Sequence, residues 1–168
     1  MDNNTLTEKL LSDSNFATLD ASNFVKTYIE KLVYNILTYV NDKISLGTIE
    51  ITDNYVAKNE LSQNITGCPS AFSSVDGATS ALIAFAEEYS HLGVTDLDML
   101  CKEVIVDFLN LHNGLFVVKL SQDNICELSL DAPKQDGSYT IDNTTYKSIT
   151  VIPIIFSYGT IKFLLCEI

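Results

Sequence analysis

The sequence predicts an α+β protein in which an antiparallel sheet packs against long helices. Apolar residues recur at helical spacing in the segments before Ser121, whereas the apolar period changes to two after it. The strand-like segments at the C-terminal end are separated by hairpin-length turns, which favour antiparallel neighbours. A chain of 168 residues with 46% hydrophobic side chains can bury a full core, so we expect one domain.

The N-terminal residues 1–20 are rich in Asn, Thr, Ser and Asp, and we expect them to form an arm or linker before a single domain over residues 21–168. Asp20 or Ser22 can cap a first helix that runs to about Val40. Its apolar residues share the core-facing spacing: Phe24, Val25, Tyr28, Ile29, Leu32, Val33, Ile36 and Leu37. This helix should therefore lie on the sheet.

The middle of the chain gives weaker signals. Residues 48–57 look like a strand, and the polar residues 58–67 look like a connection. A second helix ends near Gly93, and its candidate first residues are Ser73, Ser74 and Asp76. Thr95 and Asp98 resemble a capping box, which would start a third helix that reaches about Ser121.

Four strands are expected after this helix, over residues 125–130, 138–141, 146–156 and 160–168. Turns at Asp136-Gly137, Asp142-Asn143 and Tyr158-Gly159 separate them. Pro153 cannot donate a ladder hydrogen bond, so its strand should be at an edge or locally bulged. The last segment is apolar on successive residues and should be covered on both faces, either across a homodimer or as the central strand of a monomer.

Composition excludes several function classes. Ten Lys and Arg against 22 Asp and Glu give a net charge of −12, which repels nucleic acid and anionic membranes. Residues 1–20 lack the features of a signal peptide, and no apolar run reaches about 18 residues, so we expect a cytoplasmic protein without a membrane span. The cysteines have no C-x-x-C spacing and read as reduced core residues: Cys68, Cys101, Cys126 and Cys166.

The third helix carries the most informative pattern. At ~100° per residue, Glu103, Asp107, Asn110 and Gly114 fall on one polar stripe of an otherwise apolar helix. A spacing of three places the acid and the carboxamide side by side, and a glycine one turn later lets another surface approach closely. We expect this stripe to face a binding partner.

This pattern resembles the signature helix of the CheC/CheX/FliY family of chemotaxis phosphatases, in which an acid-x-x-Asn pair is followed by small residues. Here Asp107-Phe108-Leu109-Asn110 supplies the pair and Asn113-Gly114 supplies the tail, although the family's acid is usually glutamate. The resemblance covers roughly residues 22–168. The first helix lacks the pair, because Glu30 is followed three residues later by Val33, so the chain is most similar to the single-site CheX branch.

The resemblance implies a CheX-like, CheC-like fold and hydrolysis of the aspartyl phosphate on a receiver domain such as CheY. Asn110 would orient the attacking water, and Asp107 would pair with the receiver's lysine. Mg²⁺ would come with the phosphorylated receiver, so the chain needs no cofactor or metal of its own. CheX proteins pair their subunits through the sheet, so a homodimer is expected.

Alternatives stay open at several residues. Glu103 is either a second partner contact or a solvated surface acid, and Asn113 either extends the recognition surface or satisfies a loop carbonyl. His112 is expected to be a core or boundary residue rather than a general base. Aspartate at position 107 shortens the reach by roughly 1.5 Å. The alternative function is therefore a catalytically weak or inactive CheX-like module that binds receiver domains or flagellar-switch partners.

Overall fold

The computed structural model describes residues 2–123, 128–136, 139–142 and 144–168. Its main sheet is antiparallel throughout, which confirms the predicted α+β class. The strand order is β1 (Ser45–Leu46), β9 (Ser148–Phe156), β10 (Gly159–Glu167), β5 (Ala71–Gly77), β4 (Glu60–Thr66) and β6 (Ser129–Leu130). Two more strands join the edges, because β2 (Glu50–Thr52) also pairs with β9 and β7 (Lys134–Asp136) pairs with β4.

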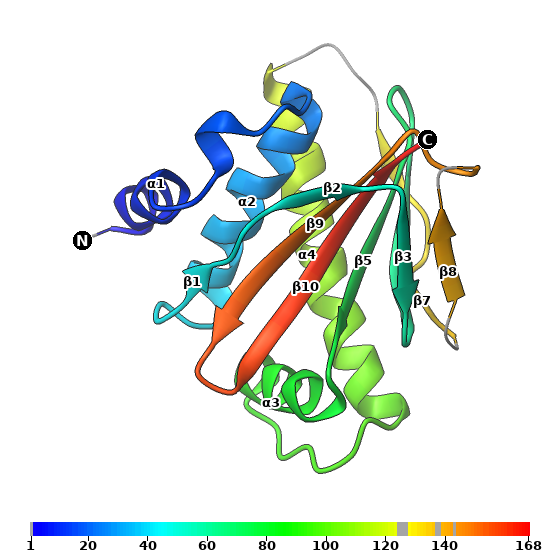
Figure 1. Ribbon diagram of the computed structural model, residues 1–168. Coiled ribbons are helices and arrows are strands. Elements are labelled where there is room, and N and C mark those ends of the chain that lie inside the picture. The colour runs from blue at the N-terminus through cyan, green and yellow to red at the C-terminus, as the bar shows by residue number, and fades with distance from the viewer. Residues whose placement is uncertain (1, 124–127, 137–138, 143) are drawn as a thin grey trace.

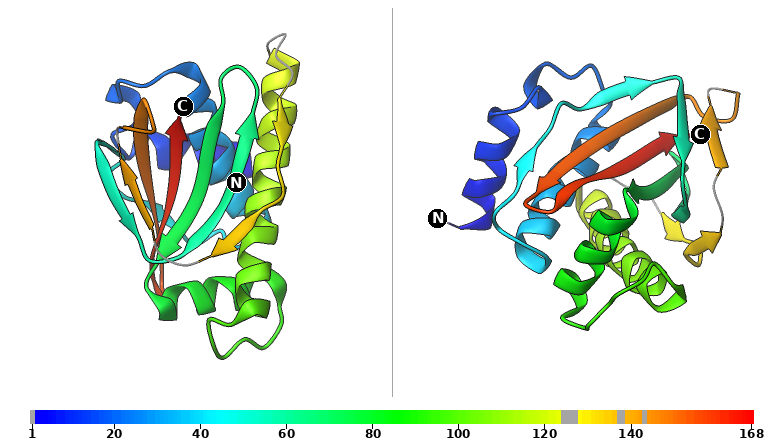
Figure 2. Two further views of the ribbon diagram at one scale, coloured as in Figure 1. Left: turned by 90° about the vertical axis from the view of Figure 1, so that its right-hand side faces the viewer. Right: turned by 60° about the horizontal axis from the view of Figure 1, so that its bottom comes forward.

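Helices cover one face of this sheet (Figures 1 and 2). The helices are α1 (Asn3–Ser12), α2 (Asn23–Tyr39), α3 (Thr79–Ser90) and α4 (Met99–Asp123), with a short 3₁₀ turn, η1 (Phe16–Thr18), after α1. The long helix α4 contacts both α2 and α3, and it also contacts β4 and β5. The core lies between these helices and the sheet and includes Tyr28, Phe85, Phe108, Phe116 and Phe163, each fully buried.

The N-terminal segment expected as an arm or linker is helical and packs on the domain. Asp2 caps α1 by accepting from the Thr5 backbone N–H at 2.8 Å, and Leu11 is part of the main core. The Ser22 side chain accepts from the Val25 N–H at 3.3 Å, so Ser22 rather than Asp20 caps α2. The predicted helix over residues 22–40 is thereby confirmed.

Two central strands, β4 and β5, were missed from sequence. The segment 58–67 was predicted as a polar connection, and Ser73, Ser74 or Asp76 was predicted to start a helix; instead β4 and β5 pair with each other inside the sheet. The reason is that their polar side chains have partners in the interior: Ser74 Oγ donates to the Leu61 carbonyl at 3.2 Å, and Ser73 Oγ donates to Asn113 Oδ1 at 3.1 Å. Helix α3 starts only at Thr79.

Helix α4 begins later than predicted. Asp98 Oδ1 accepts from the Cys101 N–H at 3.0 Å, so Asp98 is the capping side chain and the helix starts at Met99 rather than beside Thr95. By length and composition α4 could cross a membrane, but half of its most apolar window is buried inside the protein. Burial of that kind is typical of a core helix.

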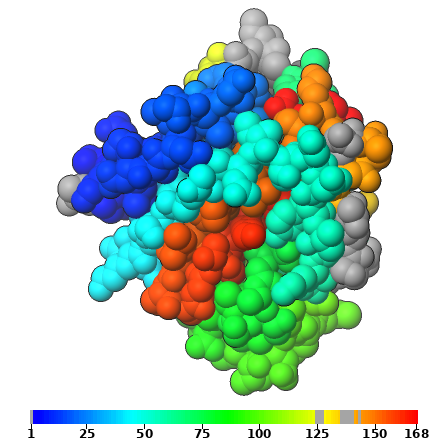
Figure 3. Space-filling model, in the orientation of Figure 1, coloured from blue at the N-terminus to red at the C-terminus, as the bar shows by residue number. Residues whose placement is uncertain are grey.

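The opposite face of the sheet is covered by the chain itself. Strands β3 (Asn54–Ala57) and β8 (Tyr139–Asp142) form a second, two-stranded sheet. Ile141 of this sheet joins a separate apolar cluster on the main sheet, and Tyr55 packs against it; the cluster members from the main sheet are Phe72, Ile149, Val151, Leu164 and Cys166. In Figure 3 the segment containing β2 and β3 lies over much of this face, so β10 is visible only in part.

The C-terminal strand is therefore covered on both faces, as predicted, but as a central strand of a single chain. Strand β9 is not an edge strand either, because it pairs with β10 on one side and with β1 and β2 on the other. Pro153 lies opposite the break between β1 and β2, where the Gly47 N–H donates to the Pro153 carbonyl at 2.8 Å. The irregularity expected at Pro153 thus falls in the neighbouring strand.

The predictions of core cysteines and of turns between the C-terminal strands are confirmed only in part. Cys101 and Cys166 are buried and unpaired, and burial raises the pKa of Cys166 to about 12, but Cys68 is exposed rather than in the core. Cys126 lies outside the described residues, as do Gly137 and Asn143 of two predicted turns. The predicted turn at Tyr158-Gly159 joins β9 to β10, and Gly159 has φ 136°, a conformation that favours glycine.

Candidate functional site

The polar stripe of α4 is on the surface, as its spacing predicts. Glu103, Asp107 and Asn110 are exposed, while Ile105, Phe108 and Leu109 on the other side of the helix are buried. Gly114 is half-buried, and a Cβ added there would meet nothing within 4 Å. The surface therefore offers an acid, a carboxamide and an open backbone position along one line.

Asp107 is held by a residue from α3. Tyr89 Oη donates to Asp107 Oδ2 at 2.9 Å. Partial burial raises the pKa of Tyr89, and the hydrogen bond to Asp107 raises it further, so the phenol stays protonated and remains a donor. The carboxylate of Asp107 thus has one oxygen engaged within the chain.

Asn110 is held by a residue from β4. Gln63 Nε2 donates to Asn110 Oδ1 at 2.7 Å and also donates to the backbone carbonyl of Asp131 at 2.9 Å. Gln63 is buried, although it lies in the segment predicted as a polar connection. Sequence reasoning missed Gln63, because 47 residues separate it from Asn110 and only the pairing of β4 brings them together.

Asn113 does not lie on the recognition surface, which corrects one of the two predictions for this residue. It is fully buried, and its Nδ2 donates to Gln63 Oε1 at 2.9 Å. Its Oδ1 accepts from Ser73 Oγ at 3.1 Å, and Ser73 Oγ in turn lies 2.7 Å from Tyr28 Oη. Asn113 therefore satisfies side chains of the sheet rather than a loop carbonyl.

His112 is a core residue, as predicted. It is fully buried between α2 and α4, with Asn35 Nδ2 3.0 Å from its Nδ1. Burial lowers the pKa of His112 to about 3, and the positive charge of Lys31 acts in the same direction. A neutral, buried imidazole has no access to a partner bound at the polar stripe.

A groove of about 470 Å³ borders the site on the side of Asp107. It is lined mainly by apolar and aromatic side chains from α2, α3 and α4: Tyr39, Tyr89, Leu100, Val104 and Leu111, with Ser90, Glu103 and Asp107 as its polar members. Glu103 and Asp107 therefore belong both to the polar stripe and to this groove.

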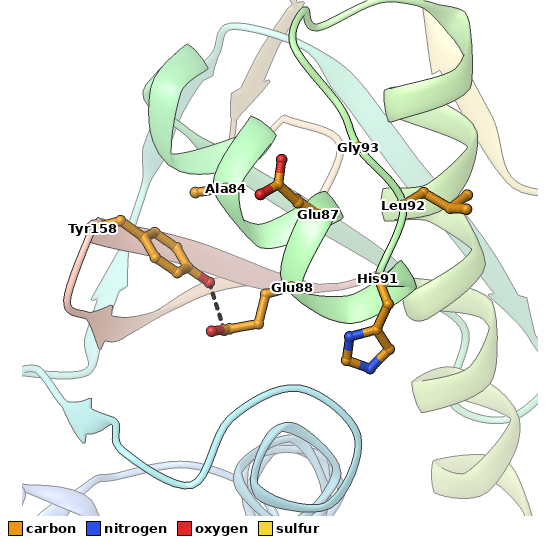
Figure 4. A pocket seen from close by; sticks show the side chains of 7 residues that line it. All are labelled: Ala84, Glu87, Glu88, His91, Leu92, Gly93 and Tyr158. Atoms are coloured by element: carbon orange, nitrogen blue, oxygen red, sulfur yellow. Dashed lines mark hydrogen bonds between the residues drawn. The ribbon is translucent and has the colours of Figure 1, made fainter.

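A second hollow lies at the C-terminal end of α3 (Figure 4). Glu88 turns toward Tyr158, whose Oη donates to Glu88 Oε1 at 3.0 Å, and Glu88 Oε2 also accepts from Asn41 Nδ2 at 2.9 Å. Both oxygens of Glu88 in this hollow therefore hold other parts of the fold in place.

Within the described ranges, no three His, Cys, Asp or Glu side chains form a group that could hold a metal ion.

No protein-family model matches the sequence, and no curated protein matches it either. Solved structures do match the fold. A CheC-like superfamily protein from Shewanella sp. PV-4 superimposes with a TM-score of 0.73 at 12% identity, over 88% of this chain and 99% of that one. A chemotaxis protein CheX from Desulfovibrio desulfuricans gives a TM-score of 0.70 at 16% identity, over 88% of this chain and 100% of that one.

A third match is a complex. A chain of a CheX–CheY–BeF₃–Mg²⁺ complex from Borrelia burgdorferi gives a TM-score of 0.60 at 12% identity, over 86% of this chain and 97% of that one. All three similarities span nearly the full length of the other chain and most of this one. The resemblance seen in the signature helix is thus confirmed at the level of the fold: the chain has the α+β fold of the CheC-like and CheX chemotaxis proteins.

Proposed function

We propose that this protein is a cytoplasmic CheX-like phosphatase that hydrolyses the aspartyl phosphate of a CheY-like receiver domain. The observation that carries the proposal is the pair Asp107 and Asn110, exposed one turn apart on α4 of a CheX-like fold. The match to a chain of the CheX–CheY–BeF₃–Mg²⁺ complex supports a receiver as the partner. Mg²⁺ belongs to the phosphorylated receiver in this proposal.

The chemistry needs positioning rather than a nucleophile from this chain. An acyl phosphate with bound Mg²⁺ reacts when a water is placed in line with phosphorus. A carboxamide can donate to a phosphoryl oxygen and accept from that water, which is the role we assign to Asn110. Asp107 would pair with the receiver's lysine, and its bond to Tyr89 leaves its second oxygen available for this contact.

The test is the rate of phosphate loss from a phosphorylated receiver with Mg²⁺, with and without this protein. We expect Asn110→Ala to remove the acceleration and lower the melting temperature by only a few degrees, because the side chain is exposed and its loss costs one hydrogen bond, while Gln63 Nε2 keeps the Asp131 carbonyl. Asn4→Ala is the matched control, since Asn4 is also an exposed helical asparagine and lies on α1. Equal turnover by wild type and Asn110→Ala would contradict the assignment.

A binding module without turnover is the second candidate. Two observations favour it: residue 107 is an aspartate, with a shorter reach than glutamate, and Tyr89 holds one of its oxygens. Under this reading the protein binds a receiver or a flagellar-switch component through the same stripe. Saturable receiver binding with no change in the rate of phosphate loss would select it over the phosphatase.

We also propose a homodimer paired through sheet edges. Since β10 is central, a second copy would have to use one of the outer strands, which are β1 and β2 on one side and β6 and β7 on the other. Sedimentation at micromolar concentration tests this. A doubled mass is expected, and the mass of one chain across the concentration range would rule the dimer out.

A further inference from the structure

The side chain that holds Asn110 is itself fully engaged. Gln63 uses Nε2 for Asn110 Oδ1 and for the Asp131 carbonyl, and it uses Oε1 to accept from Asn113 Nδ2. Gln63 is 1% exposed and Asn113 is fully buried, so the bond between them is shielded from water, while the bonds from Gln63 to Asn110 and Asp131 are half-buried. The exposed Asn110 is therefore tied to the interior by a chain of amides.

One backbone carbonyl fixes the orientation of all three side-chain amides, those of Gln63, Asn110 and Asn113. The Asp131 carbonyl can only accept, so Gln63 must point Nε2 toward it and Oε1 toward Asn113. Asn113 must then donate to Gln63 and present Oδ1 to Ser73. A flipped Gln63 would place its oxygen against two acceptors in a buried site, where each unsatisfied group costs about 1–3 kcal/mol.

The same logic decides which end of Asn110 faces outward. Because Gln63 Nε2 is a donor, Asn110 must offer it Oδ1, which leaves Nδ2 on the exposed side of the helix. Nδ2 has no hydrogen-bond partner within the part of the chain that the structure describes. The donor end of the carboxamide is thus free for an incoming anion, and Oδ1 keeps a second lone pair.

We propose that Gln63 is a positioning residue, which fixes the Asn110 carboxamide with its Nδ2 donor toward the bound phosphoryl group and thereby sets the rate of phosphate hydrolysis. This inference rests on the proposed phosphatase function. In a mechanism that depends on placement, an error near 1 Å can cost ~10²-fold in rate. If Asn110 rotated freely, some of the molecules would turn Oδ1 toward the phosphoryl group. Oδ1 and the phosphoryl oxygens are both acceptors, so no hydrogen bond would form in those molecules.

Gln63→Glu is the sharpest variant, because it preserves size and lets Oε1 still accept from Asn113. The ionised carboxylate cannot donate to Asn110, whereas the protonated acid regains one O–H donor. Gln122→Glu is the control, since it makes the same change at an exposed position of α4. Gln63→Met removes the hydrogen bonds without adding a charge and replaces Gln63→Glu if that variant does not fold.

Turnover of a phosphorylated receiver with Mg²⁺ is then measured against receiver concentration between pH 5.5 and 8. At pH 8 we expect Gln63→Glu to lower kcat by ~10²-fold with a change in KM below about threefold, and to recover relative to wild type as the introduced carboxyl is protonated. A merely structural role for Gln63 would not produce such recovery at constant fold content. A kcat within threefold of wild type in a folded variant would overturn the proposal.

A second measurement needs no activity and separates this inference from the function on which it rests. The ¹H–¹⁵N signals of the Asn110 side-chain amide should show restricted motion in the wild type and in Gln122→Glu, and fast averaging in Gln63→Met, which offers Asn110 neither a donor nor an acceptor. If the Asn110 side-chain amide is equally restricted in the wild type and in Gln63→Met, Gln63 does not position it and the proposal is overturned. If the wild type accelerates no receiver, the phosphatase function fails, while these signals still report whether Gln63 holds Asn110.

Discussion

At the residue scale, Asp107 departs most clearly from the family pattern. We expect Asp107→Glu to hold or raise turnover, because the longer side chain restores the usual reach, and Asp107→Ala to weaken receiver binding. Receiver affinity and turnover are measured together, with Asp123→Glu as the control for the same change at the far end of α4. If neither change at Asp107 alters binding or turnover, Asp107 is an ordinary surface acid.

Gly114 tests whether a partner approaches α4 closely. A Cβ at this position meets nothing within the protein, and alanine is about 1 kcal/mol better than glycine inside a helix, so Gly114→Ala should raise stability. The same methyl group should lower receiver affinity if the receiver's backbone packs there. Urea unfolding and binding titration give the two values, with Gly93→Ala, another open glycine, as control. Unchanged affinity would remove Gly114 from the interface.

At the element scale, α3 ends in a strained residue. His91 follows the last turn with φ 59° and ψ 20°, the left-handed conformation, and it is the sole such non-glycine residue in the described ranges. A side chain with a Cβ is strained in this conformation, whereas glycine adopts it freely. His91→Gly should stabilise the protein by about 0.5–1 kcal/mol, measured by urea unfolding. His91→Ala should give no such gain, because alanine keeps the Cβ.

At the scale of the whole molecule, the buried His112 links stability to pH. Its pKa is about 3 in the folded protein and near 6.5 when exposed, so the unfolded chain binds the extra proton between these values. His112 therefore contributes a loss of stability as pH falls below 6.5, with a slope of up to about 1.4 kcal/mol per pH unit. His112→Leu should flatten this part of the curve.

Urea unfolding at a series of pH values from 7 to 4.5 measures the slope. His91→Asn is the control, because His91 is exposed and asparagine tolerates the left-handed conformation. That variant should keep the wild-type slope. A slope in His112→Leu equal to that of the wild type would show that other groups determine the acid sensitivity.

Local patterns were enough for several parts of the molecule. The period of the apolar residues predicted α2 and α4, the change of period predicted the β9–β10 hairpin, and the order of these elements predicted the α+β class. The acid and amide of the site were visible as well, because a spacing of three on one helix is a local property. These features depend on residues close together in the chain, which is why the sequence alone determined them.

Other parts were decided only by tertiary structure. Strands β4 and β5 carry buried polar residues, and those side chains are acceptable in the core only because Asn113, Tyr28 and the Leu61 carbonyl supply partners from elsewhere. The two alternatives predicted for Asn113, a partner contact or a loop carbonyl, both fail for the same reason, because its hydrogen-bond partners Gln63 and Ser73 lie in β4 and β5. Sequence patterns treat polar residues as exposed, and only the folded chain shows which of them have a buried partner.

The site shows this division most clearly. Asp107 and Asn110 could be named from sequence, but their orientation depends on Tyr89 from α3 and on Gln63 from β4, at separations of 18 and 47 residues. What covers β10 was also decided only in three dimensions. The sequence left open a second copy or a central place in one chain's own sheet, and the distant strands β3 and β8 of the same chain supply the cover. The sequence alone thus determined which side chains are available for the chemistry. The tertiary structure decided how they are held, because a hydrogen bond depends on distance in space and not along the chain.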